Sequence, residues 1–233
     1  MKATINNTAI VIPAYNADKY LEELISRISQ VSLRENIILV SDGSSDNTME
    51  VGRKLFLKVI DFPENRGKGA ALIAGFAAAI NSGFRFAISI DADLQHDPDE
   101  IPNFIKKQNE SDGDMIIGKR DFRCGRMPFL RICSNKITSF IVSLVSNRKI
   151  YDSQSGYRLY NLNLIRNLKF SSTRYQLESE IIIKYARLGG RFDFIPIATI
   201  YIGQESHISH FRDIVNFIKI IFHAIFGRNG EQR

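Results

Sequence analysis

The sequence predicts an α/β fold with a mostly parallel sheet flanked by helices on both faces. Over about the first hundred residues, short apolar runs alternate with longer segments that carry apolar residues at helical spacing. Strands separated by helices imply right-handed crossovers, which place the strands side by side and in parallel. The chain has 233 residues, of which 44% are hydrophobic and 24% are charged. This composition excludes intrinsic disorder and suffices for a proper core.

The expected strands are short apolar runs at residues 8–12, 36–40, 57–60, 84–90 and 114–117. The expected helices carry one apolar face and span residues 18–28, 67–80, 99–107 and 177–188. One more helix is expected after Ser45 and Asp46, either of which can cap it. Residues 191–201 are expected to be extended. Residues 128–146 carry an apolar stripe that Arg131 and Lys136 interrupt, which argues against a membrane span.

No linker, repeat or low-complexity segment divides the chain. We expect a single domain over residues 1–205, with a first half to about residue 118 and a second half over residues 119–205. Residues 206–233 have the pattern of an amphipathic helix, which suits a membrane surface, the same protein or a second subunit. The polar start does not match a secretory signal, and only two cysteines occur, so we expect a reducing cytoplasmic environment with free thiols.

The positive charge is concentrated in one part of the chain. The formal net charge is +6. Residues 119–150 contain eight basic residues and one acidic residue, so the remainder of the chain is nearly neutral. The charge therefore indicates a local anion-binding surface rather than a generally basic protein.

Asp91, Ala92 and Asp93 directly follow the expected strand 84–90. Sheets of this class bind their ligands at the carboxyl ends of strands. Two carboxylates at this point, with Gln95 beyond them, supply hard oxygen ligands suited to Mg²⁺ or Mn²⁺. A diphosphate and water would complete the coordination. A solvated acidic turn that caps the next helix is the alternative.

Two further segments follow strands. The segment Asp42-Gly-Ser-Ser-Asp-Asn-Thr48 leaves Asp42 free to bind a nucleobase or ribose, and ordinary turn and cap chemistry is the alternative. The segment Asn65-Arg-Gly-Lys-Gly-Ala-Ala71 opens a helix, so Lys68 and the helix N-terminus favour an anion. A close-packed glycine turn is the alternative there.

These segments belong to an ordered series. The series consists of Val11-Ile-Pro-Ala-Tyr-Asn-Ala17, Ser41 to Thr48, Asn65 to Ala70, Asp91-Ala-Asp-Leu-Gln-His-Asp-Pro98, Gly118-Lys-Arg120 and Asp152-Ser-Gln-Ser-Gly-Tyr-Arg158. In this combination the sequence closely resembles the family 2 glycosyltransferases, especially the dolichol-phosphate mannose/glucose synthase-like branch. The resemblance covers about residues 8–205. It implies a GT-A (Rossmann-like) fold, a UDP- or GDP-sugar donor, a divalent metal and inversion at the anomeric carbon.

The resemblance also implies roles for particular residues. The nucleotide pocket would be lined by Pro13, Ala14, Tyr15 and Asn16. Asp42 would contact the base, and Lys68 would lie near the donor. Asp91 and Asp93, with Ala92 between them, would hold the metal on the diphosphate, with Gln95 as a third ligand. In one departure, Ser41 replaces the first of two adjacent aspartates that the family usually shows, which bears on base or ribose recognition and leaves the metal site intact.

The basic window, residues 119–150, favours a phosphorylated acceptor, such as a polyprenyl phosphate at the inner face of a membrane. A solvated basic loop followed by a core helix is the alternative. Arginine suits phosphate oxygens, and an anionic phosphate needs no general base. The candidate acceptor-binding residues are Arg120, Arg131, Gln154, Ser155, Arg158, His210 and Arg212. A saccharide or lipid hydroxyl acceptor would require a base, for which Glu178 or Glu180 is the candidate. Solvated carboxylates on a helix surface are the alternative interpretation of this pair.

Two other classes of protein fit less well. A nucleotidyltransferase usually shows a glycine-rich basic loop after its first strand, where this chain has Pro13-Ala-Tyr-Asn16. A non-enzymatic module that binds membranes or nucleic acid would explain the basic window but not Asp91 and Asp93. We therefore expect no nucleic-acid partner.

Overall fold

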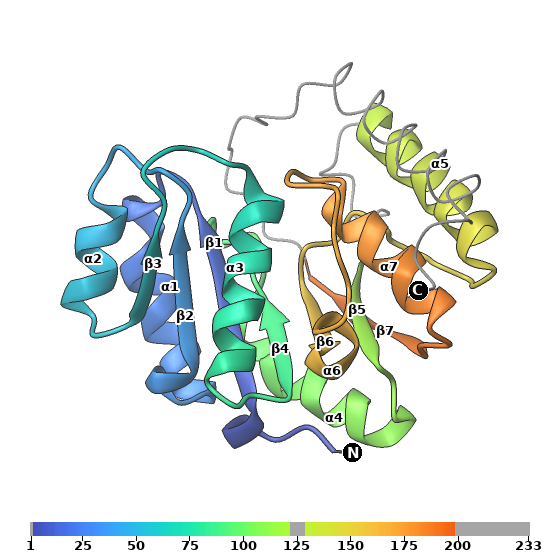
Figure 1. The fold of residues 1–233 in the computed structure, drawn as a ribbon, viewed down its shortest axis with the longest axis horizontal. Helices are drawn as coiled ribbons and strands as arrows, with labels where there is room; N and C mark the ends of the chain where they lie inside the picture. The colour runs from blue at the N-terminus through green and yellow to red at the C-terminus, as the bar shows by residue number, and fades with distance from the viewer. Residues whose placement is uncertain (1, 122–128, 199–233) are drawn as a thin grey trace.

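The computed structural model describes residues 2–121 and 129–198, apart from the side chains of residues 129–131. These residues form a seven-stranded mixed sheet in the order β3-β2-β1-β4-β6-β5-β7 (Figure 1). The strands are β1 (Thr8–Ala14), β2 (Ile37–Ser41), β3 (Lys58–Asp61), β4 (Phe86–Ser89), β5 (Met115–Arg120), β6 (Arg158–Asn161) and β7 (Phe192–Ile197). The helices are α1 (Asp18–Val31), α2 (Thr48–Lys54), α3 (Lys68–Asn81), α4 (Ile101–Ser111), α5 (Phe129–Ser146), α6 (Leu162–Ile165) and α7 (Leu177–Arg187).

The expectation of a mostly parallel sheet is confirmed. Strands β1 to β4 pair in parallel, as do β5 and β7. The sequence did not indicate β6, which runs antiparallel between β4 and β5. Its register sets Ser89 at the end of β4 opposite Arg158 at the start of β6. The loop before β6 therefore lies at the same edge of the sheet as the segment that follows β4.

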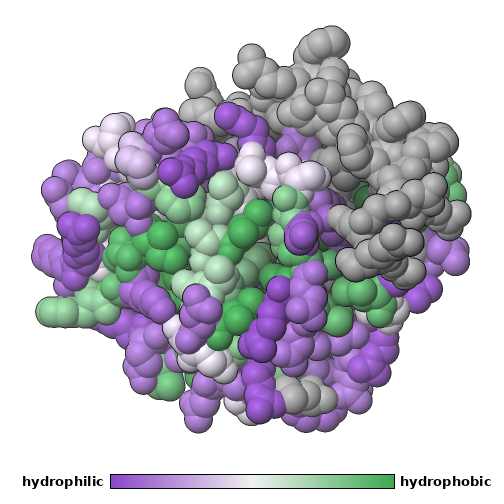
Figure 2. Space-filling model, viewed as in Figure 1, coloured by the Kyte–Doolittle hydropathy of each residue, from purple (hydrophilic) through white to green (hydrophobic). Residues whose placement is uncertain are grey.

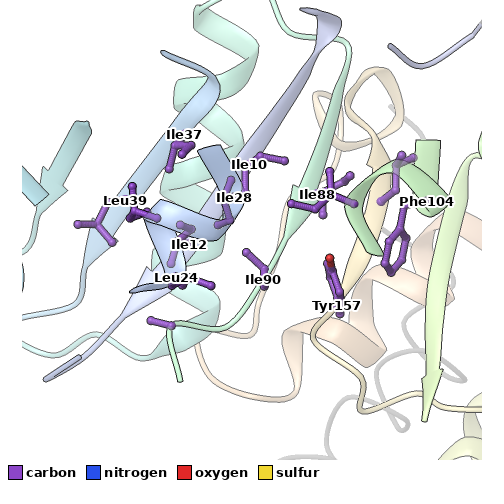
Figure 3. Packing of buried hydrophobic residues seen from close by; sticks show 14 of the residues in the cluster. Ile10, Ile12, Leu24, Ile28, Ile37, Leu39, Ile88, Ile90, Phe104 and Tyr157 are labelled. Carbon is purple, nitrogen blue, oxygen red and sulfur yellow. The ribbon is translucent and has the colours of Figure 1, made fainter. Parts of the chain in front are cut away.

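The core consists of two apolar layers, one on each face of the sheet. Successive β1 residues belong to different layers. Ile10 and Ile12 lie in the layer that contains α1 and α4, whereas Ala9 and Val11 lie in the layer that contains α3, α5 and α7. This alternation follows from the two-residue period of a strand. Figure 3 shows part of the first layer, where α1 packs over β1 and β2, and Phe104 lies beside Tyr157 with ring centroids 4.4 Å apart.

Helix α3 covers the opposite face near the middle of the sheet. Its sequence is rich in alanine, which lets the helix approach the strands closely. Figure 2 shows this side of the molecule, with apolar side chains gathered at its centre and hydrophilic side chains around them. Most of the segment with the apolar stripe forms helix α5. Among the described helices, not one combines the length and the hydropathy that a membrane crossing requires.

The N-cap of α2 is Asn47 and not Ser45 or Asp46, although Asp46 bonds to the first turn of the helix. Asp46 Oδ1 accepts the backbone amide of Thr48, the first residue of α2, at 3.0 Å. Ser45 instead donates its backbone amide to Asn16 Oδ1 at 2.8 Å. Cys133 is a free thiol, while Cys124 lies outside the described residues.

Candidate active site

The first part of the site is the junction between the ends of β1 and β2. Pro13 and Ala14 are buried in β1, whereas Tyr15 beyond it is 52% exposed. Asn16 has a positive φ of 51° and donates its backbone amide to Ser44 Oγ at 3.1 Å. The structure thus brings the four expected nucleotide-pocket residues to the edge of the sheet beside the loop that follows β2.

Asp42 begins that loop. We expected its carboxylate to be free, but the structure shows it bonded to the protein backbone. Oδ1 accepts the backbone amide of Arg66 at 2.7 Å, and Oδ2 accepts that of Gly67 at 2.9 Å. Asp42 is buried, so these two bonds fix the segment that enters α3. Its contact with a nucleobase stays a prediction, and the interaction seen here positions the neighbouring Lys68.

The glycine turn before α3 packs against protein. Gly67 has a φ of 98°, and a Cβ there would lie 2.6 Å from the carbonyl oxygen of Thr173. A Cβ on Gly69 would lie 2.7 Å from the carbonyl oxygen of Arg174. Ala70 donates its amide to Thr173 at 2.9 Å. The alternative interpretation, a close-packed turn, is therefore the one the structure shows for these glycines.

Lys68 is the centre of a partly buried charged cluster. Its side chain is 18% exposed, and Nζ lies 2.6 Å from Asp91 Oδ1 and 3.2 Å from Glu178 Oε1. The three residues come from the start of α3, the segment just after β4 and the first turn of α7. The cluster therefore forms where segments distant in sequence meet at the carboxyl edge of the parallel strands.

Burial opposes the charged forms of these residues, but their mutual attraction is stronger. Burial lowers the pKa of Lys68, yet the charges of Asp91 and Glu178 outweigh it and hold that pKa above its ordinary value. Burial likewise raises the pKa of Asp91, but Lys68 and the neighbouring His96 hold it well below its ordinary value. Burial, and then the charge of Asp91, raise the pKa of Asp93. The two aspartates thus repel each other, as expected for a pair suited to a cation.

The loop before β6 covers this cluster. A Cβ on Gly156 would lie 2.6 Å from Lys68 Nζ and 2.9 Å from Asp91 Oδ2. Ser89 Oγ donates to the carbonyl oxygen of Gly156 at 2.5 Å, which holds the loop at the end of β4. A side chain at this position would displace the charged groups beneath it.

Asp93 and Gln95 complete the segment after β4. Asp93 Oδ1 accepts the backbone amide of Gln95 at 3.0 Å, and Leu94 between them has a φ of 57°. Among the described residues, no three His, Cys, Asp or Glu side chains lie close enough to hold a metal ion together. Asp91, Asp93 and the amide oxygen of Gln95 offer hard oxygen ligands that fit Mg²⁺ or Mn²⁺, and the remaining ligands would come from substrate and water.

His96 belongs to the site but was not among the predicted residues. It is 5% exposed, its Nε2 lies 3.7 Å from Asp91 Oδ2, and its ring centroid lies 5.1 Å from that of Tyr157. The only signal in the sequence is its place five residues after Asp91, and that position does not by itself show that the imidazole reaches the carboxylate.

Arg120 lies at the end of β5 and contacts Asp152 instead of an open acceptor site. Arg120 Nε and Nη2 reach Asp152 Oδ2 and Oδ1 at 2.8 and 2.9 Å. Asn135 of α5 donates to the same carboxylate at 2.8 Å. The contact of Arg120 with an acceptor phosphate stays a prediction, and the ion pair fixes the guanidinium beside the loop before β6.

Arg158 does not face an acceptor, and that expectation is wrong. Its side chain is fully buried and donates from Nε, Nη1 and Nη2 to the backbone carbonyls of Ser155, Glu178 and Ser153, at 2.6, 2.8 and 2.7 Å. Ser155 is also buried, and its hydroxyl has no hydrogen-bond partner among the described atoms. Gln154 is exposed. Arg158 therefore ties the loop before β6 to the start of α7.

Neither Glu178 nor Glu180 is a solvated carboxylate, because both are 3% exposed. Glu180 accepts the backbone amides of Ser171 and Ser172, both at 2.9 Å, and forms an ion pair with Lys184 at 3.0 Å. Burial raises the pKa of Glu180, but these hydrogen bonds outweigh it and lower that pKa. Glu180 thus stabilises the segment before α7, whereas Glu178 joins the Lys68 cluster.

Part of the expected acceptor site cannot be placed. His210, Arg212 and the remainder of the 206–233 tail lie outside the described residues. The backbone of Arg131 lies in α5, but its side chain is not among those described.

The fold and the site define an α/β enzyme with an acidic cluster at the carboxyl edge of its parallel strands. The model of the family described as "Glycosyl transferase family 2" matches residues 9–169. The chain therefore belongs to glycosyl transferase family 2.

Curated relatives extend over most of the chain. An uncharacterized protein of Methanocaldococcus jannaschii is 31% identical over 93% of this chain and 90% of its own length. The UDP-N-acetylglucosamine–dolichyl-phosphate N-acetylglucosaminyltransferase of Methanococcus voltae is 28% identical over 95% of this chain and 96% of its own. The dolichol-phosphate mannosyltransferase of Pyrococcus furiosus is 33% identical over 76% of this chain and 52% of its own.

Solved structures agree on the fold. Glucosyl-3-phosphoglycerate synthase from Mycobacterium tuberculosis, in complex with phosphoglyceric acid, has a TM-score of 0.75 at 18% identity, over 95% of this chain and 84% of that one. The same enzyme in complex with Mn²⁺, uridine diphosphate and glucosyl-3-phosphoglycerate has a TM-score of 0.71 at 18% identity, over 99% of this chain and 86% of that one. The predicted GT-A fold is thereby confirmed for this chain.

Proposed function

We propose that this glycosyltransferase moves a sugar from a nucleoside-diphosphate sugar to a polyprenyl phosphate, with inversion at the anomeric carbon and with Mg²⁺ or Mn²⁺ as cofactor. The observation that carries the proposal is the cluster of Lys68, Asp91 and Glu178 at the carboxyl edge of the sheet. The names of the relatives support the acceptor, since two of them transfer different sugars to the same kind of lipid phosphate.

The donor side of the site is the edge formed by β1, β2 and β4. Tyr15 offers an exposed ring. Beside it, Asn16 joins the loop after β1 to the loop after β2, and Asp42 joins that second loop to the segment before α3. Asp91 and Asp93 carry the oxygens that would bind the cation. The chemistry that Mg²⁺ or Mn²⁺ supplies at such a site is neutralisation of the charge on the departing diphosphate.

The acceptor side adjoins the loop before β6. A lipid phosphate is already anionic at neutral pH, so its oxygen attacks the anomeric carbon without a general base. The residues of this chain therefore have to position the phosphate and exclude water. Arg120 holds its guanidinium at this loop through Asp152, and we assign Arg131, His210 and Arg212 to the same anion site.

An acceptor that lies in a membrane determines the cellular location of the enzyme. We propose a cytoplasmic enzyme attached peripherally to the inner face of the membrane, where the donor and the lipid phosphate meet. Helix α5 supports this, because Ile137, Phe140 and Leu144 lie on it at helical spacing and are exposed. The 206–233 tail is assigned to membrane contact or to a second copy of the chain.

The test is a donor screen with UDP- and GDP-sugars in the presence of Mn²⁺, with and without polyprenyl phosphate. The proposal predicts that one donor yields a lipid-linked sugar, and that removal of the metal with EDTA stops the reaction. Polyprenol without the phosphate is the matched control and should yield no product. Transfer to polyprenol or to a saccharide, but not to the phosphate, would contradict the proposed acceptor.

A further inference from the structure

Lys68 contacts two carboxylates that differ in their surroundings. Asp91 is 27% exposed and belongs to the proposed cation site, whereas the side chain of Glu178 is 4% exposed. Lys68 Nζ is closer to Asp91, at 2.6 Å, than to Glu178, at 3.2 Å. The ammonium therefore stands next to the carboxylate that a divalent cation would bind.

The ammonium and a divalent cation would compete for Asp91 Oδ1. A Mg²⁺ or Mn²⁺ ion binds a carboxylate oxygen at about 2.0–2.2 Å. A cation at that distance from Asp91 Oδ1 would lie within a few ångströms of Lys68 Nζ. Two positive charges so close in a partly buried site repel each other strongly. Occupation of Asp91 Oδ1 by the cation therefore favours movement of Lys68 away from that oxygen.

The surroundings favour movement of Lys68 toward Glu178. The backbone of Gly156 lies so close to Lys68 that even a Cβ would come within 2.6 Å of Nζ. On the other side, Glu178 Oε2 is buried and has no hydrogen-bond partner among the described atoms. A buried carboxylate oxygen without a donor is costly, and an approaching ammonium would satisfy it.

Glu178 is also held firmly in place. Its backbone carbonyl accepts Arg158 Nη1 at 2.8 Å, and Arg158 is fully buried. The first turn of α7 therefore presents the Glu178 carboxylate at a fixed point beside Lys68. A carboxylate at a fixed position can hold the displaced ammonium in one place, so the site stays ordered.

We propose that Glu178 is a positioning residue that receives the Lys68 ammonium when a divalent cation occupies Asp91. The proposal rests on the metal site of the proposed function. Before the cation binds, Lys68 neutralises Asp91 and competes with the metal. After it binds, Lys68 pairs with both oxygens of Glu178 and stays beside the donor, where its charge can face the diphosphate.

Two single variants and their combination test this by Mn²⁺ affinity, measured on the full chain without donor by the electron paramagnetic resonance signal of free Mn²⁺. Lys68→Met removes the competitor and should tighten binding about tenfold. Glu178→Gln removes the receiving charge and should weaken binding about tenfold. The double variant should bind like Lys68→Met, because Glu178 acts only through Lys68.

Matched controls are Lys106→Met and Glu110→Gln on the exposed face of α4, where the side chains are 74% and 56% exposed. Both should bind Mn²⁺ like the unmodified protein, and urea unfolding confirms that every variant is folded. If Glu178→Gln weakens binding equally with and without Lys68, or if Lys68→Met weakens binding, the positioning role is wrong and the metal site stands. Absence of Mn²⁺ binding by the unmodified protein, with or without UDP, would overturn the metal site of the proposed function and this inference with it.

Discussion

Arg120 and Asp152 form a two-point ion pair, with Nε–Oδ2 and Nη2–Oδ1 distances of 2.8 and 2.9 Å. Asp152 is fully buried and also accepts from Asn135 of α5. The pair therefore joins the end of β5 and α5 to the loop that covers the Lys68 cluster. Planar two-point contacts of this kind fix orientation as well as charge.

Replacement of Asp152 by Asn should destabilise the protein. The change keeps the shape but leaves the Arg120 guanidinium without its buried counter-charge, which costs about 2–4 kcal/mol for a largely buried pair. Urea denaturation measures the loss in the free energy of unfolding. Asp112→Asn is the control. Asp112 follows the last residue of α4, is exposed and has a left-handed backbone conformation that Asn adopts equally well. Equal stability of both variants would contradict the role given to Asp152.

The same ion pair predicts a dependence of stability on pH. Burial raises the pKa of Asp152, but the charge of Arg120 outweighs it and lowers that pKa below its ordinary value. A carboxyl with a lowered folded-state pKa contributes stability above its unfolded pKa, about 3.9, and loses it as the pH falls through the folded value. The stability difference between the unmodified protein and Asp152→Asn should be constant from pH 7 to about 5 and shrink below about pH 4. A difference that grows on acidification would contradict the direction of the shift.

Replacement of Arg158 by Met should destabilise the protein more than loss of a surface charge would. The variant leaves the carbonyls of Ser153, Ser155 and Glu178 without their donor in a buried site, at a cost of about 3–5 kcal/mol. Thermal unfolding should show a Tm lower by about 6–20 °C. A Tm close to that of the unmodified protein would mean that these carbonyls find other donors.

A methyl group on Gly156 should impair activity more than stability. The added Cβ would lie 2.6 Å from Lys68 Nζ, at the free end of a flexible side chain that can yield. Gly156→Ala should therefore lower kcat/KM at least about tenfold, while the Tm changes by only about 2–4 °C for each kcal/mol of strain. The comparison of steady-state kinetics with thermal unfolding separates the two effects. Full activity would show that the loop does not have to contact the cluster.

The first half of the fold was predictable because its signals are local. The apolar runs that became β1 and β2 are continuous, and helical spacing marks α1 and α3. Strand β6 was not predictable, because its four residues begin with Arg158. A buried arginine gives no apolar pattern, and its burial depends on backbone carbonyls that only the folded chain brings together.

The candidate site was likewise predictable only in part. The position of Asp91 after β4 follows from the rule that ligands bind at strand ends, and the structure places Lys68 beside it. The partners of Asp42 and Arg120 could not be predicted, because a sequence shows a charged residue but not which distant group takes its charge. Glu178 and Glu180 are two residues apart on one helix, yet only contacts with remote segments assign one to the charged cluster and the other to residues 171–172.

The central claim is that Asp91 and Asp93 support metal-dependent sugar transfer to a polyprenyl phosphate. The most direct measurement is formation of the lipid-linked sugar by Asp91→Asn and Asp93→Asn, with Asp112→Asn as the folded control of the same chemistry. We predict that both site variants lose at least about a hundredfold in kcat while their thermal unfolding stays close to that of the control. Transfer at the unmodified rate by either site variant would contradict the account.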